Sequence, residues 1–210
     1  MPRYEITKSL IESWYYVQDC WEGGEEEAMN AFMAALRGEK EELTEEQMQN
    51  IQNGFDFEKL VTDLATGVPV PDDFCPKWRR AGEEFAGLLQ GAQFQVRIHK
   101  PITVRGIDFE IHGVLDALRE GTIFDIKFKN KSFGSLDLPG SYINSAQHPF
   151  YFYLVPEARR FLYLVSDGVD VYIEQYTPEE SRDAYDVIAE FVDFLQSAGL
   201  MDLYKEHWAV

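Results

Sequence analysis

Apolar residues recur at helical spacing over the first 90 residues of the chain. Leu10, Ile11 and Trp14 fall on one side of a helix, and Thr44 and Gln47 have the spacing of a capping box. Glycines and prolines mark the turns between such segments. The pattern predicts five helices, over residues 9–21, 25–36, a segment that begins at Thr44, 55–64 and 76–89.

Beyond Gly91 the apolar residues alternate with polar ones, which is the period of a β-strand. Glu120-Gly121 and Asp167-Gly168 are typical of tight turns between antiparallel strands. The chain is therefore predicted to be a single mixed α/β domain (1–210), with a helical N-terminal part (1–90) and a core (91–210). Within the core we expect strands over residues 94–98, 107–118, 122–128, 161–165 and 169–176, and helices over 145–154 and 178–200.

The composition narrows the class of protein. The 210 residues are 45% hydrophobic, which suits a packed core and excludes a disordered or collagen-like chain. Cys20 and Cys75 are isolated, so a disulfide framework is not predicted. The chain starts without an apolar signal segment, and no stretch reaches the length of a membrane span. We expect a cytoplasmic protein with no membrane partner.

Charge is distributed unevenly along the chain. There are 37 Asp and Glu against 19 Lys and Arg, a net charge of −18, and the mean field of such a chain repels phosphate. Residues 95–133, in contrast, carry seven basic and five acidic side chains, and Lys127, Lys129 and Lys131 form a basic run there. Contact with nucleic acid is therefore expected at the predicted strands, and it should be weak, salt-sensitive and assisted by a divalent cation.

Two carboxylates and a lysine are predicted to meet on one hairpin. Asp125 and Lys127 are two residues apart on a strand and so face the same side, and Asp116 lies across the turn. Carboxylate oxygens suit Mg²⁺ or Mn²⁺, and a neighbouring lysine can hold a water or stabilise charge on a phosphate. Solvated polar positions on a half-exposed hairpin explain this spacing equally well.

A second pair of polar residues lies on the helix predicted over residues 145–154. Gln147 and Tyr151 are four residues apart and share a helix face, from which both could reach a phosphate or a metal-bound water. An ordinary amphipathic surface helix shows the same spacing. Pro149 indicates that this helix begins just before it or is kinked.

Together these residues resemble the three motifs of the PD-(D/E)XK nuclease superfamily, in its RecB-like and lambda-type exonuclease branch. The motifs are Gly-x-x-Asp, Asp-x-Lys and Gln-x-x-x-Tyr, and the resemblance covers residues 95–154. In chain order the matching residues are Gly113 and Asp116, Asp125 and Lys127, and Gln147 and Tyr151. The resemblance implies a restriction-endonuclease-like αβα core, in which helices flank a mixed sheet made of a meander and two later strands.

The resemblance also implies a metal ligand on an earlier helix, four residues after a glycine. Glu58 follows Gly54 at this spacing, and Glu83 and Glu84 are the competing candidates. One more acidic residue in a glutamate-rich region is the alternative explanation for Glu58.

The implied activity is hydrolysis of phosphodiester bonds in DNA, in recombination, repair or phage DNA metabolism. The implied ligands of one or two Mg²⁺ or Mn²⁺ ions are Glu58, Asp116, Asp125 and the backbone carbonyl of Ile126. Lys127 would orient the attacking water, and Gln147 and Tyr151 would position the DNA strand. Further contacts to nucleic acid are expected from Ser9, Lys129, Lys131 and His148. Some relatives hold an iron–sulfur cluster on four cysteines, which two cysteines exclude.

Several alternatives stay open at this point. DNA is the expected partner, but RNA as substrate, endonuclease action, a recombination partner protein and a homo-oligomer are not separated by the sequence. A different class is a non-catalytic acidic binding protein on a nuclease fold that regulates a nucleic-acid enzyme. A structure in which Asp116 and Asp125 point apart, or in which Lys127 lies in the core, would favour that class. His99 and His112 are expected to be hydrogen-bonded strand residues rather than metal ligands.

Overall fold

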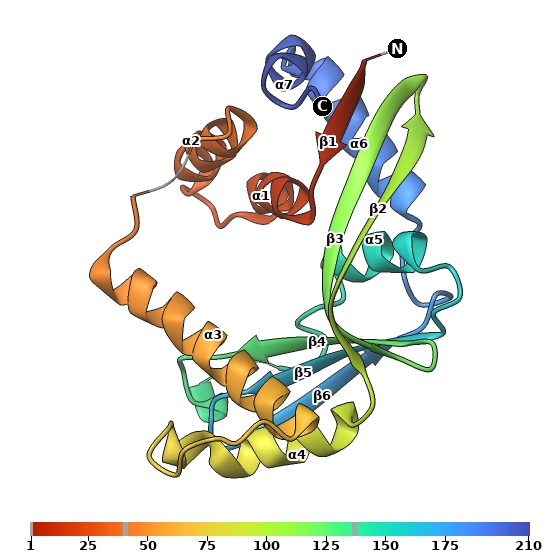
Figure 1. The fold of residues 1–210 in the computed structure, drawn as a ribbon. Coiled ribbons are helices and arrows are strands. Elements are labelled where there is room, and N and C mark those ends of the chain that lie inside the picture. Colours follow the sequence, from red (N-terminus) through yellow and green to blue (C-terminus); the bar gives the residue numbers. More distant parts are fainter. Residues whose placement is uncertain (1, 40–41, 136–137) are drawn as a thin grey trace.

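A computed structural model describes residues 2–39, 42–135 and 138–210. At its centre is a six-stranded sheet with the order β1-β3-β4-β5-β6, in which β2 also pairs with β3 (Figure 1). The pairs β1–β3 and β4–β5 are parallel, and the other pairs are antiparallel, so the sheet is mixed. The strands are β1 (Arg3–Ile6), β2 (Gln93–Val104), β3 (Ile107–Arg119), β4 (Thr122–Phe128), β5 (Arg160–Ser166) and β6 (Val171–Tyr176).

Helices flank this sheet, and β2 and β3 extend together beyond β4, β5 and β6 as a curved arm, at whose far end β1 pairs with β3 (Figure 1). The α-helices of the described residues are α1 (Lys8–Asp19), α2 (Glu25–Leu36), α3 (Glu45–Thr66), α4 (Arg79–Leu89), α5 (Gln147–Leu154), α6 (Ala184–Ser197) and α7 (Met201–His207). Short 3₁₀ turns cover Pro76–Trp78 and Phe133–Ser135. None of these helices combines the length and the apolar composition that a membrane span requires.

Two apolar cores hold helices against the two faces of the sheet. On β4, the side chain of Ile123 belongs to one core and that of Phe124 to the other, as expected from the alternation of side chains along a strand. The larger core packs α1, α2, α5, α6 and α7 against one face, around Trp14 and Phe191. The smaller core packs α3 and α4 against the other face, around Phe57. This layering confirms the predicted mixed α/β class and is consistent with a nuclease-like αβα fold.

The hairpin that carries the predicted chemistry turns where the sequence predicted. Glu120 and Gly121 have φ angles of +49° and +74°, and β3 and β4 pair up to Arg119 and Thr122. Two successive positive φ angles give the twist that two-residue hairpins need. The same conformation at Arg105 and Gly106, with φ angles of +52° and +75°, joins β2 to β3.

The N-terminal part differs from the prediction in two ways. Residues 3–6 form β1, because Tyr4 and Ile6 point into the core while Arg3 and Glu5 do not, a pattern too short to show a period. The two helices expected from Thr44 and over residues 55–64 are one continuous helix, α3. A glycine inside a helix costs only about 1 kcal/mol relative to alanine, which capping at both ends and the burial of one face offset.

The last predicted helix is also shorter than expected. It was expected over residues 178–200, but α6 begins at Ala184. Asp183 has an extended backbone and accepts a hydrogen bond from Tyr185 N at 2.7 Å, so it is the N-cap. This cap starts the helix later than Pro178, which stands in a preceding turn.

Candidate functional site

The residues of the predicted motifs line one cavity of about 420 Å³. The cavity opens between α1, α3, α5 and the strands β3 and β4. Its walls are formed by Thr7, Lys8, Glu58, His112, Gly113, Val114, Asp116, Asp125, Ile126, Lys127, Gln147 and Tyr151. The fold therefore brings together parts of the chain that are up to 144 residues apart in sequence.

The hairpin of β3 and β4 supplies the carboxylates and the lysine. Asp125 is only 3% exposed, and its Oδ2 lies 2.7 Å from Lys127 Nζ. Across the hairpin, Asp116 Oδ2 accepts a hydrogen bond of 2.8 Å from the backbone N–H of Ile126. Asp116 and Asp125 thus face the same cavity, and Lys127 keeps 27% of its side chain exposed. Neither condition that would favour a non-catalytic protein is met.

Helix α5 places Gln147 against Asp125. Gln147 is buried, its Nε2 donates to Asp125 Oδ1, and its Oε1 accepts a 3.3 Å hydrogen bond from Lys8 Nζ. Both ends of the amide are therefore used, and Lys8 orients it.

The glycine of the first motif has a packing role. A Cβ on Gly113 would lie 2.5 Å from Leu154 Cδ1 and 2.9 Å from Tyr151 Cε1. Without a side chain at Gly113, Tyr151 can reach the strand, where its hydroxyl donates to the carbonyl of Val114 at 2.8 Å. Gly113 and Tyr151 thus seat α5 close to β3, which places Gln147 beside Asp125.

Glu58 enters the cavity from α3 and is held by β2. Gln95 Nε2 donates to Glu58 Oε1 at 2.5 Å. Gln95 has a φ of +50°, in the left-handed region that non-glycine residues rarely adopt. The competing candidates Glu83 and Glu84 are exposed on α4 and do not line the cavity.

The carboxylates of the site repel one another in the absence of a cation. Burial, together with the charges of Asp125 and Glu58, raises the pKa of Asp116 to about 8. Burial and the charge of Asp125 also raise the pKa of Glu58. For Lys127 the effect of burial is overcome by Asp125 and Asp116, which hold its pKa above the ordinary value. Lys127 is therefore charged at neutral pH, and the site carries an excess of negative charge when all its carboxylates are ionised.

The donor set suits a hard divalent cation. Among the described residues, Asp125 Oδ2 is buried with no aligned hydrogen-bond donor, although Lys127 Nζ lies 2.7 Å away. A cation would also relieve the repulsion among the carboxylates that, together with burial, raises the pKa of Asp116. Within the described ranges, however, no three acidic, histidine or cysteine side chains converge closely enough to hold a metal ion as they stand. The reason is visible in the contacts: Gln147 and Lys127 hold Asp125, and Gln95 holds Glu58. Binding a metal ion would exchange some of these contacts.

The residues expected to contact nucleic acid are placed differently from one another. Lys131 is exposed, whereas Lys129 is half-buried with its Nζ 5.2 Å from the centre of the Tyr142 ring. Burial and the charge of Lys127 lower the pKa of Lys129. Neither lysine lines the cavity, and Ser9 is exposed one residue beyond Lys8.

His148 is placed in the core, contrary to the expected contact with nucleic acid. It is 1% exposed, its ring stacks on Tyr176, and its Nδ1 lies 3.3 Å from the hydroxyl of Tyr163. Burial lowers its pKa to about 4, so the ring is neutral at pH 7. The physical reason is the helical rotation of about 100° per residue, which turns His148 away from the face of Gln147.

Sequence reasoning missed two groups of the site, Lys8 and Gln95. Lys8 follows Thr7, the N-cap of α1, whose Oγ1 accepts a hydrogen bond from Leu10 N at 3.2 Å. A correct helix start would have placed Lys8 at an N-terminus, where helices often present groups to anions. Counting back from the turn at Arg105 and Gly106 would have placed Gln95 opposite Asp116.

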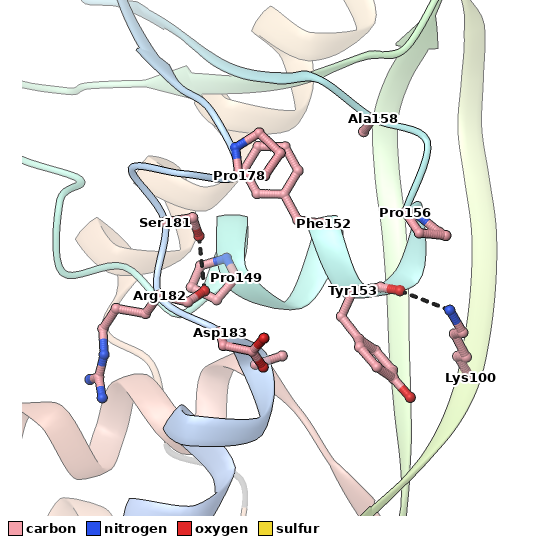
Figure 2. A pocket seen from close by; sticks show the side chains of 11 residues that line it. Lys100, Pro149, Phe152, Tyr153, Pro156, Ala158, Pro178, Ser181, Arg182 and Asp183 are labelled. Carbon is pink, nitrogen blue, oxygen red and sulfur yellow. Dashed lines mark hydrogen bonds between the residues drawn. The ribbon is translucent and has the colours of Figure 1, made fainter.

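A larger cavity of about 580 Å³ lies on the other face of α5 (Figure 2). It is lined by Pro149, Phe152 and Tyr153, which point away from the face of Gln147 and Tyr151. Its polar groups already have protein partners: Lys100 Nζ donates to the carbonyl of Tyr153 at 3.2 Å, and Asp183 caps α6. Among the residues that line it, Asp183 is the one carboxylate, whereas Glu58, Asp116 and Asp125 line the cavity of about 420 Å³.

Comparison with known proteins finds similarity in structure at low sequence identity. No protein-family model and no curated protein matches it. The crystal structure of SSO0001 is similar with a TM-score of 0.47 and 14% sequence identity, over 93% of this chain and 77% of that chain. The crystal structure of Scheffersomyces stipitis Rai1 is similar with a TM-score of 0.36 and 13% identity, over 93% of this chain and 61% of that one. Neither likeness is close enough to transfer a site or an activity.

Proposed function

We propose that the chain is a metal-dependent nuclease of the PD-(D/E)XK type that hydrolyses phosphodiester bonds in DNA. More narrowly, we propose an exonuclease of the RecB-like branch that serves recombination, repair or phage DNA metabolism. One observation carries the proposal: three sequence motifs, each short enough to arise by chance, line a single cavity. Asp116, Lys127 and Gln147 come to this cavity from β3, β4 and α5.

The metal ligands we propose are Glu58, Asp116, Asp125 and the backbone carbonyl of Ile126. A bound Mg²⁺ or Mn²⁺ would lower the pKa of a water ligand and neutralise charge on the phosphate. Asp125 would hold the ion in exchange for part of its present contacts with Gln147 and Lys127.

The remaining side chains position the reacting groups. Lys127 is held charged beside Asp125, so it can donate hydrogen bonds to the attacking water and to the phosphate oxygen on which negative charge develops. When Gln147 is no longer hydrogen-bonded to Asp125, its amide can contact the DNA strand. Tyr151 acts as a positioning residue, because its hydroxyl fixes α5 on Val114.

Linear and circular duplex DNA, incubated with the full chain in Mg²⁺ or in EDTA, test this function. We expect linear DNA to be degraded in Mg²⁺, circular DNA to survive, and EDTA to stop the reaction. Asp125→Ala and Lys127→Ala should each lower the rate at least about 100-fold, the range seen when a group that stabilises transition-state charge is removed. Lys59→Ala is the matched control, because Lys59 is exposed on α3 and pairs with Asp63.

Other outcomes separate the alternatives. Cutting of circular DNA would indicate an endonuclease instead of an exonuclease. Faster cutting of RNA than of DNA would indicate that RNA is the substrate. If Mg²⁺ gives no degradation, or if both variants cut as fast as the unaltered chain, the enzyme proposal fails. The net charge of −18 motivates the remaining candidate, an acidic binding protein that regulates a nucleic-acid enzyme, and that candidate predicts no degradation.

A further inference from the structure

Two histidines that the proposed reaction does not use face each other on the arm of β2 and β3. His99 and His112 are direct partners in the antiparallel register, and both are exposed. Their ring centres are 5.7 Å apart, with one ring edge toward the other. Directly opposite side chains on neighbouring antiparallel strands share one face of the sheet, with Cβ atoms about 5 Å apart.

The surroundings of this pair include charged side chains on both sides. Both histidines line a cavity of about 390 Å³ together with Glu5 and Arg97, and another of about 520 Å³ together with Glu110. Within the described part of the chain, neither imidazole is hydrogen-bonded to a protein group, so the expected role as hydrogen-bonded strand residues is not met. Their ring nitrogens are available to a ligand from solvent.

We propose that His99 and His112 form a cation site for Zn²⁺ or a similar borderline-soft transition metal, beside the carboxylate cavity, whose wall includes His112. Imidazole nitrogen is a good ligand for these ions, whereas Mg²⁺ takes oxygen ligands. With Zn–N bonds of about 2.0–2.1 Å, two imidazoles on one tetrahedral ion place their ring centres roughly 5 Å apart. The observed separation of the ring centres is 5.7 Å, and rotation of the two side chains would have to turn one nitrogen of each ring toward the ion.

Water completes the coordination in this proposal. Glu110 is two residues from His112 on the same face of β3, and it is the nearest carboxylate in the register. Its Oε2 is held by Arg3 at 3.0 Å, and no third acidic, histidine or cysteine side chain of the described residues converges on the pair. The site is therefore a two-imidazole chelate. It stands on geometry alone and does not depend on nuclease activity.

Zinc binding to the metal-stripped full chain tests the site directly. Isothermal titration with ZnCl₂, in buffer that holds Mg²⁺ in excess to cover the carboxylates, should show one zinc ion bound per chain. Nitrogen-15 NMR should show the imidazole signals of His99 and His112 shifting together, while that of His207, exposed on α7, stays in place.

Substitution of each histidine completes the test. His99→Gln and His112→Gln should each weaken zinc binding at least tenfold, and His207→Gln should leave it unchanged. Both positions are exposed on the arm, and circular dichroism checks that each variant is folded. Zinc affinity unchanged in either variant, or zinc that shifts neither imidazole signal, would overturn the proposal. Because the readout is binding, these results are independent of whether DNA is cut.

Discussion

At the scale of single residues, the proposed role of Asp116 as a metal ligand conflicts with stability, because the role needs an ionised carboxylate at a buried position. Its carboxyl group is buried near Asp125 and Glu58, and its pKa is raised to about 8. In the unfolded chain the pKa is near the ordinary value of 3.8. Between these two values the unfolded chain has released a proton that the folded chain retains, so the free energy of unfolding falls as the pH rises.

We therefore expect Asp116→Asn to stabilise the metal-free protein at pH 8 while it abolishes DNA cleavage. Asparagine keeps an oxygen for the N–H of Ile126 and carries no charge. In EDTA the melting temperature should rise by at least about 3 °C at pH 8, the change that roughly 1 kcal/mol produces in a chain of this length. The gain should shrink toward pH 5. Thermal unfolding followed by circular dichroism measures both, with Asp72→Asn, on an exposed loop, as control.

A lower melting temperature for Asp116→Asn than for the unaltered chain at pH 8 would contradict this expectation. It would mean that the carboxylate contributes more through its hydrogen bond than it costs through burial and repulsion.

At the scale of elements, the contact between α5 and β3 decides whether the third motif reaches the first two. Gly113 leaves the space into which Leu154 and Tyr151 pack, and Tyr151 anchors the helix on the strand. Gly54 has no such role, because a Cβ there would meet nothing within 4 Å. Both glycines were identified from their spacing to an acidic residue, but close packing requires a glycine only at position 113.

Gly113→Ala should destabilise the protein by about 1–3 kcal/mol, the usual cost of overpacking. It should also lower the rate of DNA cleavage, because it displaces α5. Gly54→Ala should instead stabilise α3 by about 0.5–1 kcal/mol. Urea denaturation of the two variants beside the unaltered chain measures both changes. Equal stability of Gly113→Ala and the unaltered chain would show that α5 can move away at no cost.

Much of this site was accessible from the sequence because its chemistry is local. Asp125 and Lys127 share a face by strand alternation, and a two-residue turn brings Asp116 to the same side. Apart from Gln95, which the register of its own hairpin places, what sequence reasoning missed depends on packing between distant elements. Lys8 reaches Gln147 only because β1 docks parallel to β3, and no pattern over four residues reveals such docking. The burial of His148 likewise depends on Tyr163 and Tyr176, which follow it on later strands.

At the scale of the whole molecule, acidic side chains outnumber basic ones, so few Lys and Arg side chains are available to contact the phosphates of DNA. The basic run after β4 is fastened to α3 through Asn130, which accepts from Asn53 at 2.7 Å and donates to the carbonyl of Asn50 at 3.3 Å. Lys131 is exposed and follows directly after this contact. DNA affinity should therefore depend on a small number of identifiable lysines.

Lys131→Gln should weaken DNA binding and reduce the slope of log affinity against log salt by about one, the signature of one lost phosphate contact. Lys205→Gln on α7 makes the same change in charge and should leave the slope unchanged. Fluorescence anisotropy of a labelled duplex, measured in the Asp125→Asn background to prevent cleavage, gives both slopes. Identical slopes for the two variants would remove Lys131 from the contact surface.

The hydrogen bond between Lys8 and Gln147 joins residues 139 positions apart, and this separation has a consequence for folding. Closing so long a loop costs entropy that is recovered only when both ends have docked, so contacts of this kind form late. During synthesis, β3 and β4 can pair well before α5 leaves the ribosome. The residues around the carboxylate cavity would then be brought together only in the last steps of folding, after α5 has docked.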